Sequence, residues 1–119
     1  MSDEFVNAFL NMETAVMVAP MLFDGFRMTV KLVLSIVPAA MAFGLLIAVL
    51  RDLKIPGLNF LLIVYVDLLR SFPPLVLIIY LYAGLPFMGI ELSEFGTVVI
   101  VLVANGAAFF GEIFRAGLE

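Results

Sequence analysis

The stretch Asn105-Gly-Ala-Ala-Phe-Phe-Gly-Glu-Ile-Phe-Arg-Ala-Gly-Leu-Glu119 decides the fold, because it places polar and charged side chains on an apolar helix pattern. At about 100° per residue, five side chains share an arc of roughly 80°. These are Asn105, Ala108, Glu112, Arg115 and Glu119. A strip of small residues lies beside this arc: Ala104, Ala107 and Gly111. Polar groups in hydrocarbon are costly, so the pattern predicts a helix that lines a path inside a membrane bundle.

The composition indicates an all-α integral membrane protein. Of the 119 residues, 65% are hydrophobic, whereas soluble domains have about 45–50%. Cysteine and histidine are absent, which excludes disulfides, thiolate nucleophiles and histidine metal sites. There is no phosphate-binding Gly-x-x-x-x-Gly-Lys-Ser/Thr loop. We therefore expect no enzyme activity, no metal and no cofactor held by the chain itself. The net charge of −4 does not favour nucleic acid as a partner.

Three membrane spans are expected, at about residues 28–50, 60–83 and 97–114. The preceding segment, 1–24, is expected to be extracytoplasmic or interfacial. Its apolar spacing fits a short amphipathic helix, and a poorly ordered terminus is nearly as good an interpretation. Pro20 and Gly25 are predicted to break the helix before the first span.

The second apolar region is too long for one straight crossing and contains charges. Its first part is expected to lie on the aqueous side and to enter the membrane near Ser71. Asp67 and Arg70 are three residues apart, so they are predicted to pair on one helix face. Pro73 and Pro74 predict a bend. Ser93 is a candidate cap for the next helix.

Basic residues set the expected orientation. With three spans, two basic residues lie on one side of the membrane, Arg27 and Lys31. Four lie on the other side, namely Arg51, Lys54, Arg70 and Arg115. Because basic residues favour the cytoplasm, we expect the N-terminus outside and the C-terminus inside.

Three polar residues of the last helix are candidates for function. Asn105 is expected near the midplane, where its amide contacts either a polar solute or a neighbouring helix, with the interhelical role somewhat favoured. Glu112 and Arg115 form either an ion pair at the membrane edge or an element that gates or couples to a cytoplasmic partner. Both alternatives remain open.

Three stretches in register resemble the membrane subunit of bacterial ABC importers for polar amino acids, the histidine, glutamate, glutamine, arginine and opine permeases. They are Asp24-Gly-Phe-Arg-Met-Thr-Val-Lys-Leu, Tyr65-Val-Asp-Leu-Leu-Arg-Ser-Phe-Pro-Pro-Leu75 and the stretch that begins at Asn105. In the second stretch, Asp67 replaces the family's usual Glu and Ser71-Phe72 replaces Gly-Thr. The resemblance covers the chain from about residue 24, so residues 25–119 are expected to be a partial transmembrane domain of the type I fold.

The resemblance implies a permease subunit in the bacterial inner membrane that pairs with a second permease. Two ATPase subunits, which bind the ATP, and an extracytoplasmic solute-binding protein are the other implied partners. Residues at matching family positions are expected in the translocation path or in helix packing: Asp67, Arg70, Pro73, Asn105, Glu112 and Arg115. Membrane lipid surrounds the bundle, and a polar amino acid is the implied substrate.

One departure from the family lies after Arg115. Family members continue into a cytoplasmic loop that grips the ATPase and then into two further spans, whereas this sequence reaches Glu119 first. We therefore expect a truncated permease that does not couple to an ATPase by itself. A small structural or regulatory helical membrane protein, with no transport activity, is the alternative, because the small-residue strip would serve it equally well.

Overall fold

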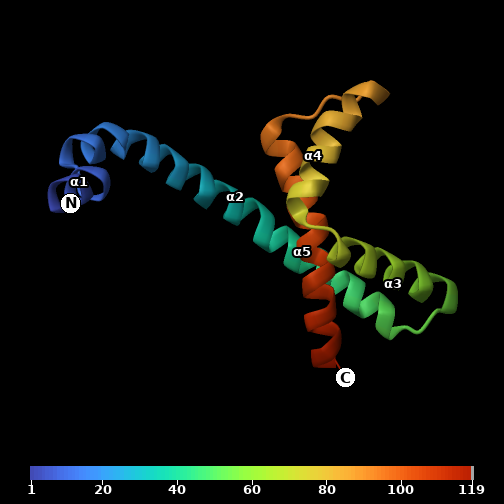
Figure 1. Cartoon of the computed structure of the whole chain (residues 1–119). Coiled ribbons are helices and arrows are strands. Elements are labelled where there is room, and N and C mark those ends of the chain that lie inside the picture. Colours follow the sequence, from blue (N-terminus) through green and yellow to red (C-terminus); the bar gives the residue numbers. More distant parts are fainter. Residues whose placement is uncertain (119) are drawn as a thin grey trace. The chain divides into compact units, whose positions relative to one another are not determined.

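The computed structural model describes residues 1–118, and the regular structure in that range is entirely helical, as expected (Figure 1). In chain order the helices are α1 (Ser2–Phe9), α2 (Met12–Asp52), α3 (Pro56–Ser71), α4 (Pro74–Gly84), the 3-10 helix η1 (Leu85–Met88) and α5 (Glu94–Leu118). Glu119 lies outside the described residues, so its place on the polar arc stays a prediction.

Met1–Val33 forms one compact unit and Leu34–Glu119 another. In the first unit no residue is buried. α1 is a helix, in line with the amphipathic interpretation, and its Phe5 and Phe9 rings lie 5.0 Å apart. α2 begins after Asn11, whose side-chain oxygen accepts the backbone N–H groups of Glu13 and Thr14 at 3.0 and 3.3 Å. An asparagine at this position satisfies donors that the first helical turn leaves unpaired.

The predicted break at Pro20 and Gly25 is wrong, because α2 continues through both residues. A proline removes one backbone donor, and apolar helices tolerate this loss where other groups compensate. A glycine inside a helix costs only about 1 kcal/mol relative to alanine, which does not end a helix 41 residues long. The Thr29 hydroxyl also donates to the Gly25 carbonyl at 3.0 Å.

The bend at the double proline is confirmed. α3 ends at Ser71, α4 begins at Pro74, and the two helices meet at 98° (Figure 1). In a continuous helix the carbonyl of residue i accepts the N–H of residue i+4. Pro73 has no N–H, so the Leu69 carbonyl has no helical partner.

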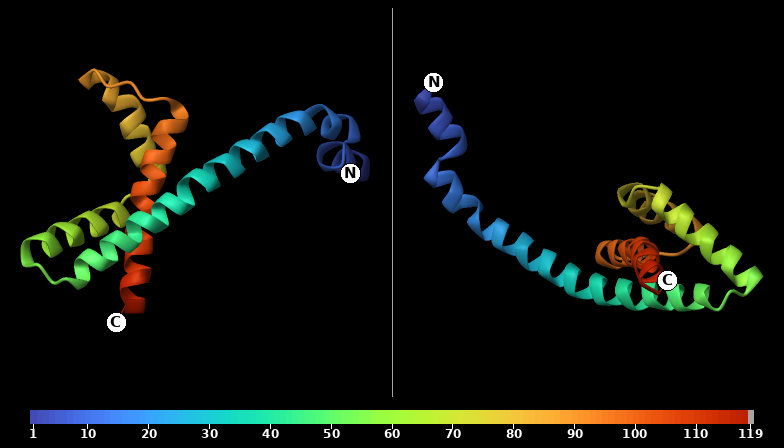
Figure 2. Two further views of the ribbon diagram at one scale, coloured as in Figure 1. Left: turned by 180° about the vertical axis from the view of Figure 1, so that it is seen from behind. Right: turned by 90° about the horizontal axis from the view of Figure 1, so that it is seen from below.

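Within the second unit, α5 contacts α2, α3 and α4 (Figure 2). Its crossing with α2 is built from small residues. A Cβ added at Gly44 would lie 2.5 Å from Phe110 Cβ, and one added at Gly111 would lie 3.2 Å from Ile47 Cγ2. The backbones therefore approach closely, as small residues allow in membrane bundles. The buried core includes Ala40, Ile47, Ala48, Val66, Val101, Ala107 and Ala108.

Two helical stretches in the described chain, Ser2–Asp52 and Glu94–Leu118, are long and apolar enough to cross a membrane. The bent pair of α3 with α4 and η1 is a third candidate if it is counted as one span. The expected Ser93 cap is present, because the Gly96 N–H donates to the Ser93 hydroxyl at 3.0 Å and α5 begins at Glu94.

Candidate functional site

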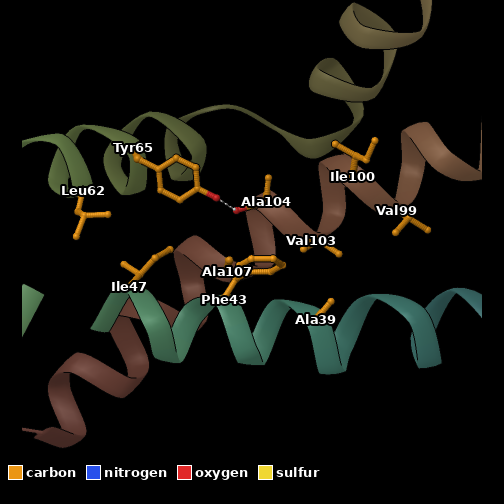
Figure 3. A pocket seen from close by; sticks show the side chains of 10 residues that line it. All are labelled: Ala39, Phe43, Ile47, Leu62, Tyr65, Val99, Ile100, Val103, Ala104 and Ala107. Carbon is orange, nitrogen blue, oxygen red and sulfur yellow. Dashed lines mark hydrogen bonds between the residues drawn. The ribbon is translucent and has the colours of Figure 1, made fainter. Parts of the chain in front are cut away.

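Two hydrogen bonds join α3 and α5 in opposite directions. The Tyr65 hydroxyl on α3 donates to the Ala104 carbonyl on α5 at 2.7 Å (Figure 3). The Asn105 amide on α5 donates to the Leu69 carbonyl on α3 at 2.8 Å. We call these two bonds the α3–α5 hydrogen-bond pair. Each helix thus supplies one side-chain donor and one backbone acceptor.

The Asn105 bond ends on the carbonyl that Pro73 deprives of its helical partner. Asn105 is only 7% exposed, so its amide lies where water cannot substitute for a lost hydrogen bond. The amide thereby satisfies a backbone group that would otherwise be unpaired next to the bend. This geometry corresponds to the interhelical alternative for Asn105.

A second polar contact joins the ends of α2 and α5. The Glu112 carboxylate accepts hydrogen bonds from Arg51 on α2 and from Arg115 on α5, the latter at 3.0 Å. The side chains of Arg51, Glu112 and Arg115 are 13%, 24% and 33% exposed, so this Arg51–Glu112–Arg115 cluster is partly shielded from solvent. The pair between Glu112 and Arg115, three residues apart on α5, was one of the two expected alternatives, and it is the geometry observed.

The sequence analysis missed the role of Arg51, which entered only as one of the basic residues that set the expected orientation. Arg51 and Glu112 are 61 positions apart. Helical spacing reports neighbours three or four residues away, so no local pattern could have paired them.

The predicted pair between Asp67 and Arg70 is wrong. No ion pair joins them in residues 1–118. The Arg70 guanidinium instead lies over the Phe109 ring of α5, with Cζ 5.3 Å from the ring centre. An arginine gains by stacking on an aromatic face, and this contact turns it toward α5. The Asp67 side chain is exposed, and its backbone carbonyl accepts the Ser71 hydroxyl at 2.6 Å.

The remaining predicted residues lie at the same crossings. Ala107 and Gly111 are buried and Ala104 is half-buried. Gly111 lies against Ile47 of α2, and the Ala104 carbonyl belongs to the α3–α5 hydrogen-bond pair. Pro73 forms the bend between α3 and α4. The three small residues therefore lie where α5 meets α2 or α3.

An apolar cavity of about 580 Å³ opens between α2, α3 and α5 (Figure 3). Its lining residues are Ala39, Phe43, Ile47, Leu62, Tyr65, Val99, Ile100, Val103, Ala104 and Ala107. Among these, Tyr65 brings the only side-chain hydroxyl, and that group is already bonded to Ala104. Residues 1–118 also hold no cluster of three or more histidine, cysteine or acidic side chains that could bind a metal. The residues that line this cavity therefore support apolar packing rather than chemistry on a substrate.

The fold and these contacts define an integral membrane protein whose helices are joined by small-residue packing and buried polar bonds. A comparison with models of protein families finds no match. Among curated proteins, the chain is 33% identical over 98 residues to a probable glutamine ABC transporter permease, GlnP, of Bacillus subtilis. That alignment covers 82% of this chain and 45% of the relative. A probable amino-acid ABC transporter permease of the same organism, YckA, is 30% identical over 109 residues. That alignment covers 92% of this chain and 48% of YckA.

A solved structure of an amino acid ABC transporter also resembles this chain. The chain superimposes on the crystal structure of an amino acid ABC transporter with histidines at a TM-score of 0.82, with 32% identity. The match covers 92% of this chain and 50% of that one. The chain therefore belongs with the amino-acid ABC transporter permeases and matches their N-terminal region. It spans about half the length of these relatives.

Proposed function

We propose that the chain forms the membrane-spanning part of a permease subunit in an ATP-driven importer of polar amino acids. The observation that supports this most directly is the superposition on an amino acid ABC transporter over 92% of the chain. Fold alone does not establish function, but here the 32% identity accompanies the shared fold.

The proposed assembly has the partners that such a permease requires. A second permease subunit completes the path, ATPase subunits bind the ATP, and an extracytoplasmic solute-binding protein delivers the amino acid. The chain itself holds no cofactor in this proposal. The location would be the bacterial inner membrane, with the ends of α2 and α5 near Arg51 and Arg115 on the cytoplasmic side.

We assign the candidate residues to two roles within this proposal. Asn105, with Pro73, fixes the bend between α3 and α4, because its amide satisfies the carbonyl that the proline leaves unpaired. Glu112 and Arg115, with Arg51, fix the ends of α2 and α5. Asp67 and Arg70 lie on α3 next to the bend, where Arg70 contacts Phe109. Five of the six predicted residues, all but the exposed Asp67, then act on the shape of the path.

A chimera tests the proposal. The whole chain would be fused in frame to the half of the Bacillus subtilis glutamine permease that it does not match, and expressed in cells that lack that permease. We expect energy-dependent uptake of labelled glutamine or another polar amino acid above the empty-vector level. A matched chimera with Gly44→Leu, which separates α2 from α5, serves as the negative control. A parent chimera that inserts normally yet transports none of the polar amino acids would contradict the proposal.

A further inference from the structure

A second cavity, of about 410 Å³, lies where α2 ends, α3 begins and α5 ends. It differs from the apolar cavity in its walls, which are rich in basic side chains. The lining residues are Ala48, Arg51, Asp52, Lys54, Asn59, Arg115 and Leu118. Of the path residues expected from the sequence, only Arg115 lines this cavity, and the proposed transport places no ligand in it.

The charges around this cavity do not balance. Three cations, Arg51, Lys54 and Arg115, line it together with one carboxylate, Asp52. Glu112 adds a second carboxylate that the two arginines share. Among the residues that the structure describes, three positive charges against two negative charges leave one positive charge in excess. Arg51 Nε is in addition buried without a hydrogen-bond partner among the described residues.

The turn between α2 and α3 holds Lys54 in an unusual backbone conformation. Its φ of 56° is the single positive value among the non-glycine residues described. A side chain in the left-handed region costs about 1–2 kcal/mol. The Lys54 N–H closes the turn by donating to the Arg51 carbonyl at 3.2 Å. This tight turn places the ammonium group of Lys54 on the same cavity wall as Arg51.

The cavity also lies at the ends of helices that are able to cross a membrane. α2 ends at Asp52 and α5 at Leu118, and both helices belong to stretches able to cross a membrane. Basic pockets between the ends of transmembrane helices suit anionic headgroups. Leu118 provides an apolar contact beside the charges, as the start of an acyl chain requires.

We propose that this cavity binds the headgroup of an anionic phospholipid, with the phosphate oxygens bonded to Arg51, Lys54 and Arg115. A zwitterionic lipid carries its own cation and leaves the positive excess unpaired, so the cavity selects anionic over zwitterionic headgroups. This inference rests on membrane insertion and not on transport, so its failure and the failure of the proposed function are separable.

Native mass spectrometry of the full chain tests the proposal. The chain would be extracted from vesicles of phosphatidylcholine alone or with phosphatidylglycerol, and the lipid retained by each molecule would be counted. We expect preferential retention of one phosphatidylglycerol. Lys54→Gln should weaken that retention about fivefold, and Lys54→Arg should preserve it. Arg27→Gln removes the same charge outside the cavity and should leave retention unchanged.

Three results would overturn the proposal. One is equal retention of the two lipids by the parent chain, and another is an equal loss in Lys54→Gln and Arg27→Gln. The third is displacement of phosphatidylglycerol by millimolar inorganic phosphate, which would identify a site for a free anion. Circular dichroism of each variant, showing unchanged helix content, confirms that a loss of lipid is not a loss of folding.

Discussion

α5 is joined to two of its neighbours, α2 and α3, in different ways. Its crossing with α2 depends on small residues, because Gly44 and Gly111 let the backbones approach within van der Waals contact. Its contact with α3 depends on the α3–α5 hydrogen-bond pair, in which two side-chain donors reach backbone carbonyls. Lipid is as apolar as leucine, so hydrophobicity does not drive helices together in a membrane. The chain therefore uses close packing at one contact and directed polar bonds at the other.

The largest effect is expected at the small-residue crossing. Gly44→Ala would place a Cβ 2.5 Å from Phe110 Cβ and 3.0 Å from the Gly111 backbone nitrogen, neither of which is the end of a flexible side chain. We expect a loss of about 2–3 kcal/mol in the free energy of unfolding, at the upper end for overpacked sites. Unfolding of the reconstituted chain by sodium dodecyl sulfate, followed by circular dichroism, measures it.

Gly25→Ala is the matched control, because nothing lies within 4 Å of a Cβ added there. It should leave stability unchanged or raise it by up to about 1 kcal/mol, since alanine is the better helix former. Equal behaviour of the two variants would show that α2 and α5 are not in close contact.

The Arg51–Glu112–Arg115 cluster should have the next largest effect. Glu112→Gln leaves two guanidinium groups without their shared counter-charge. Hydrogen bonds to charged groups contribute about 1.5–3 kcal/mol, and partial exposure of the cluster reduces this to about 1–2 kcal/mol. The same detergent titration checks it, with Glu91→Gln as the control at an exposed carboxylate. A loss no larger than that of the control would mean that the cluster does not hold the helix ends.

Asn105→Leu should lower stability by about 1 kcal/mol, within the range for polar bonds between membrane helices. The loss arises because the Leu69 carbonyl is left without a donor, since Pro73 offers none. In a Pro73→Ala background the new N–H can supply that donor, so the cost of Asn105→Leu should fall. Additive losses in the double variant, measured in the same titration, would contradict this role for Asn105.

The smallest effect is expected for Tyr65→Phe, at about 0.5 kcal/mol. The hydroxyl donates to the Ala104 carbonyl, which lies inside α5 and keeps its helical bond when the tyrosine is changed. The carbonyl of Leu69 has no such second partner. A larger loss for Tyr65→Phe than for Asn105→Leu would reverse the ranking of these two bonds.

Local patterns predicted much of this fold. The apolar helices, the bend at Pro73 and Pro74 and the cap at Ser93 each depend on neighbouring residues, and each is present. The break at Pro20 and Gly25 was wrong because local helix breakers were given more weight than the length of the surrounding apolar helix. The resemblance to amino-acid permeases was confirmed because three motifs in register carry more information than any periodicity.

The contacts between distant segments could not be predicted. Spacing placed Asp67 beside Arg70 but could not show that the Phe109 ring of another helix competes for the guanidinium. It likewise gave no sign that Arg51 reaches Glu112 across 61 residues. Pro73 implies that the Leu69 carbonyl needs a hydrogen-bond donor from elsewhere. Which residue supplies that donor depends on how α3 crosses α5, so the sequence could not identify Asn105.

Cysteine cross-linking in membranes tests most directly the central claim, that α2 packs closely against α5. The chain has no cysteine of its own. Ala40 Cβ lies 3.0 Å from a Cβ added at Gly106, close to the separation of about 3.5–4.5 Å in disulfides. We predict rapid oxidation of an Ala40→Cys/Gly106→Cys variant and little in Met41→Cys/Gly106→Cys, where the exposed Met41 position faces another direction. Equal cross-linking of the two pairs, or none in either, would contradict this packing of α2 against α5.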